Sequence, residues 1–364
     1  MSTYKSLSTA NLPDPVIDPA KGENPTDYFN TVLYTGTGAD QAITGVGFQP
    51  DWVWLKARNT TGSHGLFDSV RGATKRLSSN LTAAEDTAAG VNSFDSDGFT
   101  LDALNWNDNN DTFVAWNWKA GGSGVSNTDG SITSTVSAST EAGFSIVSYT
   151  GNGSSTGNGV VGHGLGNSSP EMIIIKARAG TNADNSWYCW HTGLSANNNL
   201  NLNDTRAQFT TSSATSGIIN TSPTSTTFGF DSGSTLLNIN ESGTTYIAYC
   251  FHSVDQYSSF GSYTGNGSTD GPFVYTGFRV GWLVVKRTDS AAGWYIVDNV
   301  RSTKNPVEDY LQANVTNAEA TATFRDHLSN GFKIRNTFTN ENASGGTYIY
   351  MAFAEQPFKF SNAR

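Results

Sequence analysis

Short apolar runs recur along the chain, and clusters of Gly, Asn, Asp or Ser separate them. The clearest run is Thr-Phe-Val-Ala-Trp-Asn-Trp at residues 112–118, and related runs follow at 245–251 and 347–353. Successive side chains of a β-strand point to opposite faces of its sheet. Because apolar residues fall on both faces of this run, the pattern predicts a central strand covered on both sides.

Four other blocks recur in the same order, which makes an internal repeat the dominant pattern of the sequence. The motif Tyr-Thr-Gly-x-Gly begins at Tyr34, Tyr149 and Tyr263. An apolar strand then ends in Lys56, Lys176 and Lys286, and a short strand closes on Asp68, His191 and Asp298. A block with Phe at its second position follows at 98–101, 227–230 and 331–334.

β-Branched and aromatic residues dominate these blocks and turn residues bound them, so each block predicts a strand. The sequence therefore predicts an all-β fold of three tandem β-sandwich or jelly-roll-like repeats with an extended N-terminal arm. Each repeat is expected to bury its own recurrent aromatic strands. The expected units are the arm at 1–30, repeat 1 at 31–119, a Gly/Ser linker and lead-in at 120–142, repeat 2 at 143–254 and repeat 3 at 255–364.

The segments between the blocks predict local features. The Gly- and Ser-rich start of 120–142 predicts a flexible linker, which would leave repeat 1 more independent than the other two. Asn152-Gly153 and Asn266-Gly267 predict hairpin turns. Residues 73–84 and 305–320 hold helix formers and predict a short helix or turn. The recurrent Lys predicts either protection of an exposed sheet edge or pairing with the polar end of the third block.

Composition narrows the classes of partner. The chain has 21 Lys and Arg against 31 Asp and Glu, a net charge of −10. Nucleic-acid binders normally carry a basic face, so neither nucleic acid nor an anionic membrane surface is an expected partner. No apolar window approaches a membrane span, and no apolar stretch follows the N-terminus as in a secretory signal. Cys189 and Cys250 both fall in repeat 2, which predicts buried apolar side chains rather than a disulfide framework.

Candidate ligand chemistry concentrates in one polar stretch. Trp106 stands alone there, whereas the other tryptophans lie within the repeated strands. Trp106, Asp108 and Asp111 are therefore the candidate ligand-binding residues. The Asp108-Asn-Asn-Asp111 cluster offers oxygen ligands for calcium, but it lacks the spacing of a calcium loop. Since Asp favours turns through its own backbone hydrogen bonds, a turn is the preferred interpretation.

Catalytic residues do not recur with the repeats. Asp95 with Asp97, or Asp108 with Asp111, supply the residue types of a glycosidase, but neither pair returns in the other repeats. Repeat 3 has Asp298 where repeat 2 has His191. No zinc-ligand spacing, phosphate loop or nucleophile motif is present. The sequence predicts no enzyme, no cofactor and no metal site.

The blocks together resemble a known repeat. Residues 34–38, 47–56, 68–72, 94–99 and 113–119 are similar to the tandem β-repeat of fibre-like and other structural virion proteins of marine tailed bacteriophages. Residues 332–336, 345–350 and 358–364 resemble the C-terminus of the same group, and the resemblance covers residues 30–364.

This resemblance implies a virion structural protein exposed on the particle surface, as a tail fibre or capsid decoration, after assembly in the host cytoplasm. Attachment to other virion proteins through the N-terminal arm is its expected role, with host-surface glycans as a second class of partner. A homo-oligomer is expected, with a trimer as one form, although the triplication can instead imitate a trimer within one chain. The alternatives are a carbohydrate-binding adhesin module and, ranked below it, a glycan depolymerase.

Overall fold

The computed structural model describes residues 17, 23–87, 90–154, 159–180, 185–210, 223–230 and 239–355. Nearly all its regular structure is β, which confirms the predicted fold class. The one α-helix described is the single turn α1 (Thr339–Asn342). None of the described helices is long and apolar enough to cross a membrane.

The strands of repeat 1 follow a short 3-10 turn, η3 (Pro25–Asp27). They are β1 (Phe29–Thr35), β2 (Gln41–Thr44), β3 (Trp52–Ala57), β4 (Gly65–Asp68), β5 (Lys75–Arg76), β6 (Asp86–Thr87), β7 (Val91–Asp95), β8 (Gly98–Leu101) and β9 (Thr112–Trp118).

Repeat 2 contributes β10 (Val125–Asn127), β11 (Ser134–Ser139), β12 (Phe144–Thr150), β13 (Val160–Gly162), β14 (Met172–Ala179), β15 (Tyr188–His191), β16 (Leu200–Asn201), β17 (Thr227–Gly229) and β18 (Thr245–Phe251). Repeat 3 contributes β19 (Ser258–Thr264), β20 (Phe273–Tyr275), β21 (Val280–Arg287), β22 (Trp294–Asp298), β23 (Val307–Gln312), β24 (Ala320–Leu328), β25 (Gly331–Ile334) and β26 (Thr347–Ala354).

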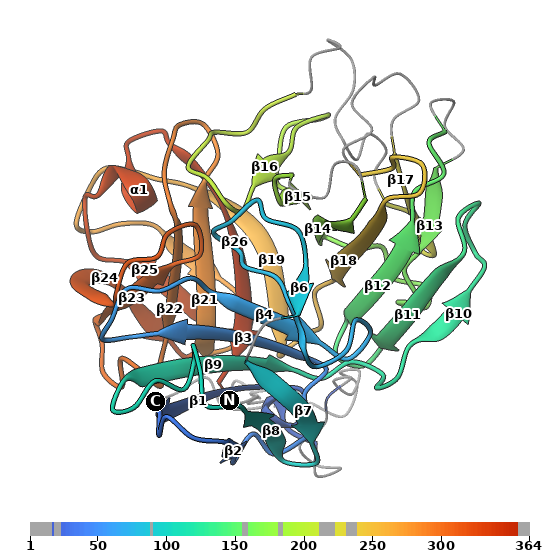
Figure 1. Cartoon of the computed structure of the whole chain (residues 1–364). Helices are drawn as coiled ribbons and strands as arrows, with labels where there is room; N and C mark the ends of the chain where they lie inside the picture. Colours follow the sequence, from blue (N-terminus) through green and yellow to red (C-terminus); the bar gives the residue numbers. More distant parts are fainter. Residues whose placement is uncertain are drawn as a thin grey trace, which may run out of the picture.

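The recurrent blocks pair in the same order in each repeat. The orders are β1-β9-β3-β4, β12-β18-β14-β15 and β19-β26-β21-β22, and all these pairs are antiparallel. The closing strand of each repeat thus lies between the Tyr-Thr-Gly strand and the Lys strand. In Figure 1 the three sheets surround the middle of the molecule, blue below, green to the right and orange to the left.

Each inner sheet is covered on its outer side. Repeat 1 adds the sheet β2-β8-β7 and repeat 2 adds β13-β17, whereas in repeat 3 the inner sheet continues through β23-β24-β25-β20. Local apolar cores lie between these layers, and in repeat 1 this core contains Phe113 and Ala115 of β9. The opposite face of β9 carries Trp116 and Trp118 into the middle of the molecule. The predicted central strand, covered on both faces, is therefore confirmed.

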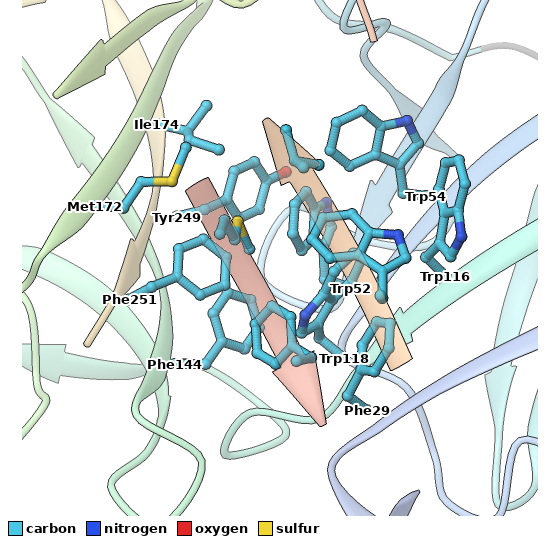
Figure 2. Packing of buried hydrophobic residues seen from close by; sticks show 14 of the residues in the cluster. Phe29, Trp52, Trp54, Trp116, Trp118, Phe144, Met172, Ile174, Tyr249 and Phe251 are labelled. Atoms are coloured by element: carbon cyan, nitrogen blue, oxygen red, sulfur yellow. The ribbon is translucent and has the colours of Figure 1, made fainter. Parts of the chain in front are cut away.

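The largest apolar cluster is shared by all three repeats (Figure 2). Each pair of repeats meets through aromatic rings there. Ring centroids lie 4.3 Å apart for Trp52 and Tyr249, 5.4 Å for Trp118 and Trp282, and 6.3 Å for Phe251 and Phe353. Each repeat thus has a local core, but the other face of its inner sheet is buried against the other two repeats. The expectation that each repeat buries its own aromatic strands is therefore wrong for this face. The expectation that repeat 1 would be more independent is wrong.

The predicted linker is part of the structure of repeat 2. Ala120 is buried and donates its N–H to Asp51, and Gly121 donates to the Ser137 hydroxyl. Strand β10 then pairs with β11 at the edge of the inner sheet. Hydrogen bonds hold the start of this segment in place, and Gly121 allows a close backbone approach: a Cβ there would lie 2.5 Å from the Ala138 carbonyl oxygen.

Other local predictions are also corrected. Residues 73–84 contain β5 and 305–320 contain β23, with no helix in either. Gly153 and Gly267 have the expected positive φ, at 68° and 70°, but their asparagine neighbours do not, and β12 does not pair with β13. Of the N-terminal arm, Ile17 is described and lies in the shared core of its own chain. Most of the arm lies outside the described residues.

Candidate functional site

The Tyr-Thr-Gly-x-Gly motif forms the same clamp in each repeat, and the clamp explains where Trp106 lies. The tyrosine hydroxyl donates to a backbone carbonyl of the loop that precedes the closing strand. The pairs are Tyr34 with Trp106 (2.8 Å), Tyr149 with Ile239 (2.8 Å) and Tyr263 with Glu341 (2.9 Å). Trp106 therefore occupies a scaffold position that the other repeats fill with different side chains.

Glycine is required at the two positions of the motif for different structural reasons. A Cβ on Gly36 would lie 2.2 Å from the Asp108 carbonyl oxygen, and a Cβ on Gly151 would lie 2.2 Å from the Glu241 carbonyl oxygen. The first glycine is thus needed for close backbone approach. The second, such as Gly38 at φ +69°, takes a conformation that other residues rarely adopt. The motif is a structural device of the scaffold.

Trp106 is buried, at 4% exposure. Its Nε1 donates to the Ser63 carbonyl at 3.1 Å, and its ring packs edge-on against Phe67 with centroids 5.6 Å apart. The Arg76 guanidinium lies 5.8 Å from the ring centroid. The polar sequence around Trp106 suggested an exposed loop, but the side chain closes the local core of repeat 1.

Asp108 shares a pocket of about 130 Å³ with Trp106, but Asp111 does not line it. The Asp111 carboxylate accepts hydrogen bonds from the Asn59 amide at 3.2 Å and the Thr60 hydroxyl at 3.0 Å. Its backbone N–H donates to the Asp108 carbonyl, as the preferred turn interpretation requires. The described residues contain no group of three or more His, Cys, Asp or Glu that could hold a metal ion.

The other carboxylate pair also serves local turns. Asp95 accepts from the hydroxyls of Ser93 and Thr100. Asp97 accepts from the backbone N–H groups of Gly47 and Gly45, and these bonds lower its pKa below the ordinary value. Both carboxylates are held within repeat 1: Asp95 stabilises the β7–β8 hairpin, and Asp97 holds the loop that follows β2.

The polar residue that ends the third repeated block, which is Asp68, His191 or Asp298, forms hydrogen bonds to a neighbouring repeat. In repeat 1, Asp68 pairs with Arg71 and accepts from the Tyr249 hydroxyl of repeat 2 at 2.8 Å. Burial lowers the pKa of Arg71, but Asp68, Tyr249 and Glu85 together outweigh burial and hold that pKa above its usual value. In repeat 3, Asp298 accepts from Trp116 Nε1 of repeat 1 at 3.0 Å.

Repeat 2 has His191 at this position because the neighbouring repeat presents a different partner. The residue equivalent to Trp116 and Tyr249 is Met351, which has no donor to offer a carboxylate. His191 Nδ1 accepts from the Gly193 N–H, so Nε2 carries the proton toward the Tyr350 carbonyl at 3.3 Å. Burial lowers the pKa of His191 to about 4, which keeps the ring neutral. Repeat 2 therefore carries His in place of Asp because its side chain donates to a backbone carbonyl, whereas Asp68 and Asp298 accept from a Tyr or Trp side chain.

The start of the third block closes a ring of contacts. His64 Nε2 lies 3.0 Å from the Gln312 carbonyl of repeat 3. Trp187 Nε1 donates to the Ser78 carbonyl of repeat 1, and Trp294 Nε1 donates to the Asn201 carbonyl of repeat 2. Each repeat therefore bonds to the one before it, and repeat 1 bonds to repeat 3.

The recurrent lysines are buried in interior strands, so edge protection is the wrong explanation. Lys56 donates to the Ala57 and Thr316 carbonyls, and Lys286 donates to the Thr205 and Ala292 carbonyls. Burial lowers the pKa of both lysines to about 8. These bonds lie at the opposite end of the sheet from the polar residue of the third block.

A site that the sequence did not single out lies on repeat 2. There, a groove of about 380 Å³ is lined by Trp190, Glu171 and His252 among others. Trp190 belongs to a repeated strand, so its position in the sequence predicted a core residue. Both cysteines, in contrast, are buried and free as expected.

The repeated motifs therefore define an all-β protein whose recurrent residues hold loops and join three sheets around one core. A family model described as "Domain of unknown function (DUF7483)" matches residues 24–357, and the chain belongs to this family. The match crosses all three repeats as one domain, in agreement with their shared core. No curated protein and no solved structure matches the chain.

Proposed function

We propose that this chain is a structural protein of a bacteriophage particle, exposed on its surface as a tail fibre or capsid decoration. It acts by attachment to neighbouring virion proteins and to the host surface rather than by catalysis. The resemblance of the five blocks to virion proteins of marine tailed phages suggests the setting.

The observation that carries the proposal is the use of the repeated polar residues. Asp68, His191 and Asp298 bond to neighbouring repeats, and the tyrosines of the first block fix loops. A chain that devotes its most repeated polar residues to locking three sheets together is suited to a load-bearing part. The triplication gives one chain the form of a trimer, which supports a particle component that needs no further copies to fold.

The test is whether the chain is part of the particle. Phage particles produced by the host that carries this gene are purified by two successive density gradients and analysed by quantitative mass spectrometry. We expect the chain to co-purify at a constant ratio to the major capsid protein, and a particle reconstruction to show its density on the surface. An abundant host cytoplasmic protein serves as the contamination control. A chain that separates from the particles together with that control would refute the proposal.

A further inference from the structure

The groove on repeat 2 lies where three inner strands reach the same edge of the sheet. Glu171 precedes β14, Thr192 follows β15, and His252 follows β18. Pro170 and Pro223 also line it, and Trp190 of β15 contributes the aromatic ring. A concave site with one aromatic surface and a few convergent polar groups is the common form of a small-ligand site.

Trp190 is the exception among the nine tryptophans of the chain. The other eight are buried, at 4% exposure or less, whereas Trp190 is partly exposed. Its strand register makes it equivalent to Phe67 and Val297, because these residues oppose Val53 and Leu283 as Trp190 opposes Ile173. Phe67 and Val297 are fully buried. Trp190 packs against the local core of repeat 2, as its equivalents do in their repeats, but its larger ring also remains partly exposed.

The polar groups beside this ring are held in place before any ligand arrives. Glu171 accepts the Ser253 N–H on one carboxylate oxygen at 2.5 Å. His252 Nδ1 lies 2.8 Å from the Ser253 carbonyl, so Nδ1 carries the proton and donates it there. His252 Nε2 is then an acceptor, but this atom is buried and has no hydrogen-bond partner within the described part of the chain. The groove thus combines the partly exposed Trp190 ring with the Glu171 carboxylate and the Thr192 hydroxyl.

We propose that this groove binds a saccharide, and that the sugar is neutral or carries an amino group. A sugar ring presents C–H groups on one face and hydroxyl donors around its edge, which match an aromatic surface flanked by acceptors. The Glu171 carboxylate and the net charge of −10 oppose acidic sugars. The inference rests on the proposed attachment role for its biological setting, but binding is measured on the isolated protein.

The first experiment is a glycan array probed with the full chain, with neutral, amino and acidic glycans represented. Three proteins are compared: the wild type, Trp190→Ala, and Tyr275→Ala as a matched control. Tyr275 is 66% exposed on β20 of repeat 3 and does not line the groove. We expect the wild type and Tyr275→Ala to bind the same neutral or amino glycans. Trp190→Ala is expected to lose affinity roughly tenfold or more, as for a central aromatic anchor.

A second measurement keeps the result clear if Trp190→Ala folds poorly. Because Trp190 is the exposed tryptophan, it should supply the part of the fluorescence that acrylamide quenches readily. The glycan found on the array should protect this part in the wild type, and Trp190→Phe should retain binding because it keeps a ring. The proposal is overturned if the wild type binds no glycan, if it binds acidic glycans alone, or if Trp190→Ala binds as well as the wild type. Presence in the particle is tested separately, so the two proposals can fail independently.

Discussion

The buried ion pair of Arg325 and Glu341 gives a test of how the repeats are related. Both side chains are fully buried in the outer layer of repeat 3. Strand pairing places Arg325 opposite Ile334 as Val91 lies opposite Leu101 in repeat 1. Through the tyrosine clamp, Glu341 corresponds to Ile239 in repeat 2. One repeat therefore uses an ion pair at positions where its relatives place apolar residues.

The perturbation is a set of three variants: Arg325→Val, Glu341→Ile and the two together. Removing one partner of a buried ion pair leaves the other charge unpaired and costs about 3–5 kcal/mol, whereas apolar replacement of both is often neutral. For about 330 residues that unfold together, this cost lowers Tm by about 4–7 °C. Each single variant is thus expected to lose that amount, and the double variant is expected to unfold within about 2 °C of the wild type.

The assay is thermal and urea unfolding followed by far-UV circular dichroism, at pH 7 and again near pH 5. Burial raises the pKa of Glu341, and Arg325 opposes the rise. Without Arg325 the carboxyl should take up a proton more readily, so Arg325→Val should regain stability as pH falls. Glu341→Ile leaves the Arg325 guanidinium, which stays charged at both pH values. The loss of stability that this variant causes through the broken pair should therefore be the same at pH 7 and near pH 5. A double variant no more stable than the worse single variant would refute the equivalence of the repeats at these positions.

Two further predictions follow from the scaffold. Burial lowers the pKa of His64 to about 3, of His191 to about 4 and of His327 to about 3. Since the unfolded chain takes up these protons below about pH 6.5, each histidine should cost about 1.4 kcal/mol of unfolding free energy per pH unit as pH falls from 6.5 toward 4. Urea titrations between pH 7 and pH 4 measure the slope, and His327→Phe should reduce it by one histidine's share; an unchanged slope contradicts the assignment. Gly151→Ala should cost about 3 kcal/mol or more, because its Cβ would meet the Glu241 carbonyl oxygen at 2.2 Å. Gly62→Ala, where no atom lies within 4 Å, is the matched control, and equal urea midpoints for the two variants would contradict the clamp.

The sequence was sufficient to predict the strands of the inner sheets. The alternation of apolar residues on both faces of residues 112–118 predicted a doubly covered strand, and β9 is one. It could not show what covers each face, because an apolar face has the same pattern against a local partner or a neighbouring repeat. The second face of β9 meets Trp282 of repeat 3, which the order of residues does not reveal.

The exposure of individual tryptophan side chains could not be predicted from the sequence either. The polar neighbours of Trp106 indicated an exposed ring, yet those neighbours form the turn that carries the ring inward. Trp190 lies in a strand that is buried in the other repeats, so its sequence position indicated a core residue. Equivalent positions differ in exposure between repeats: Phe67 is fully buried, whereas Trp190 is partly exposed. Differences of this kind between equivalent repeats appear only in the assembled fold.

The central claim is that the three repeats form one cooperative body around the shared core. Hydrogen exchange followed by mass spectrometry across a urea series tests it directly, because peptides from each repeat report their own unfolding midpoint. We expect peptides from β9, β18 and β26 to unfold at one common urea concentration, as coincident transitions require. Separate midpoints for the three strands, with repeat 1 losing protection while the others keep theirs, would contradict the account.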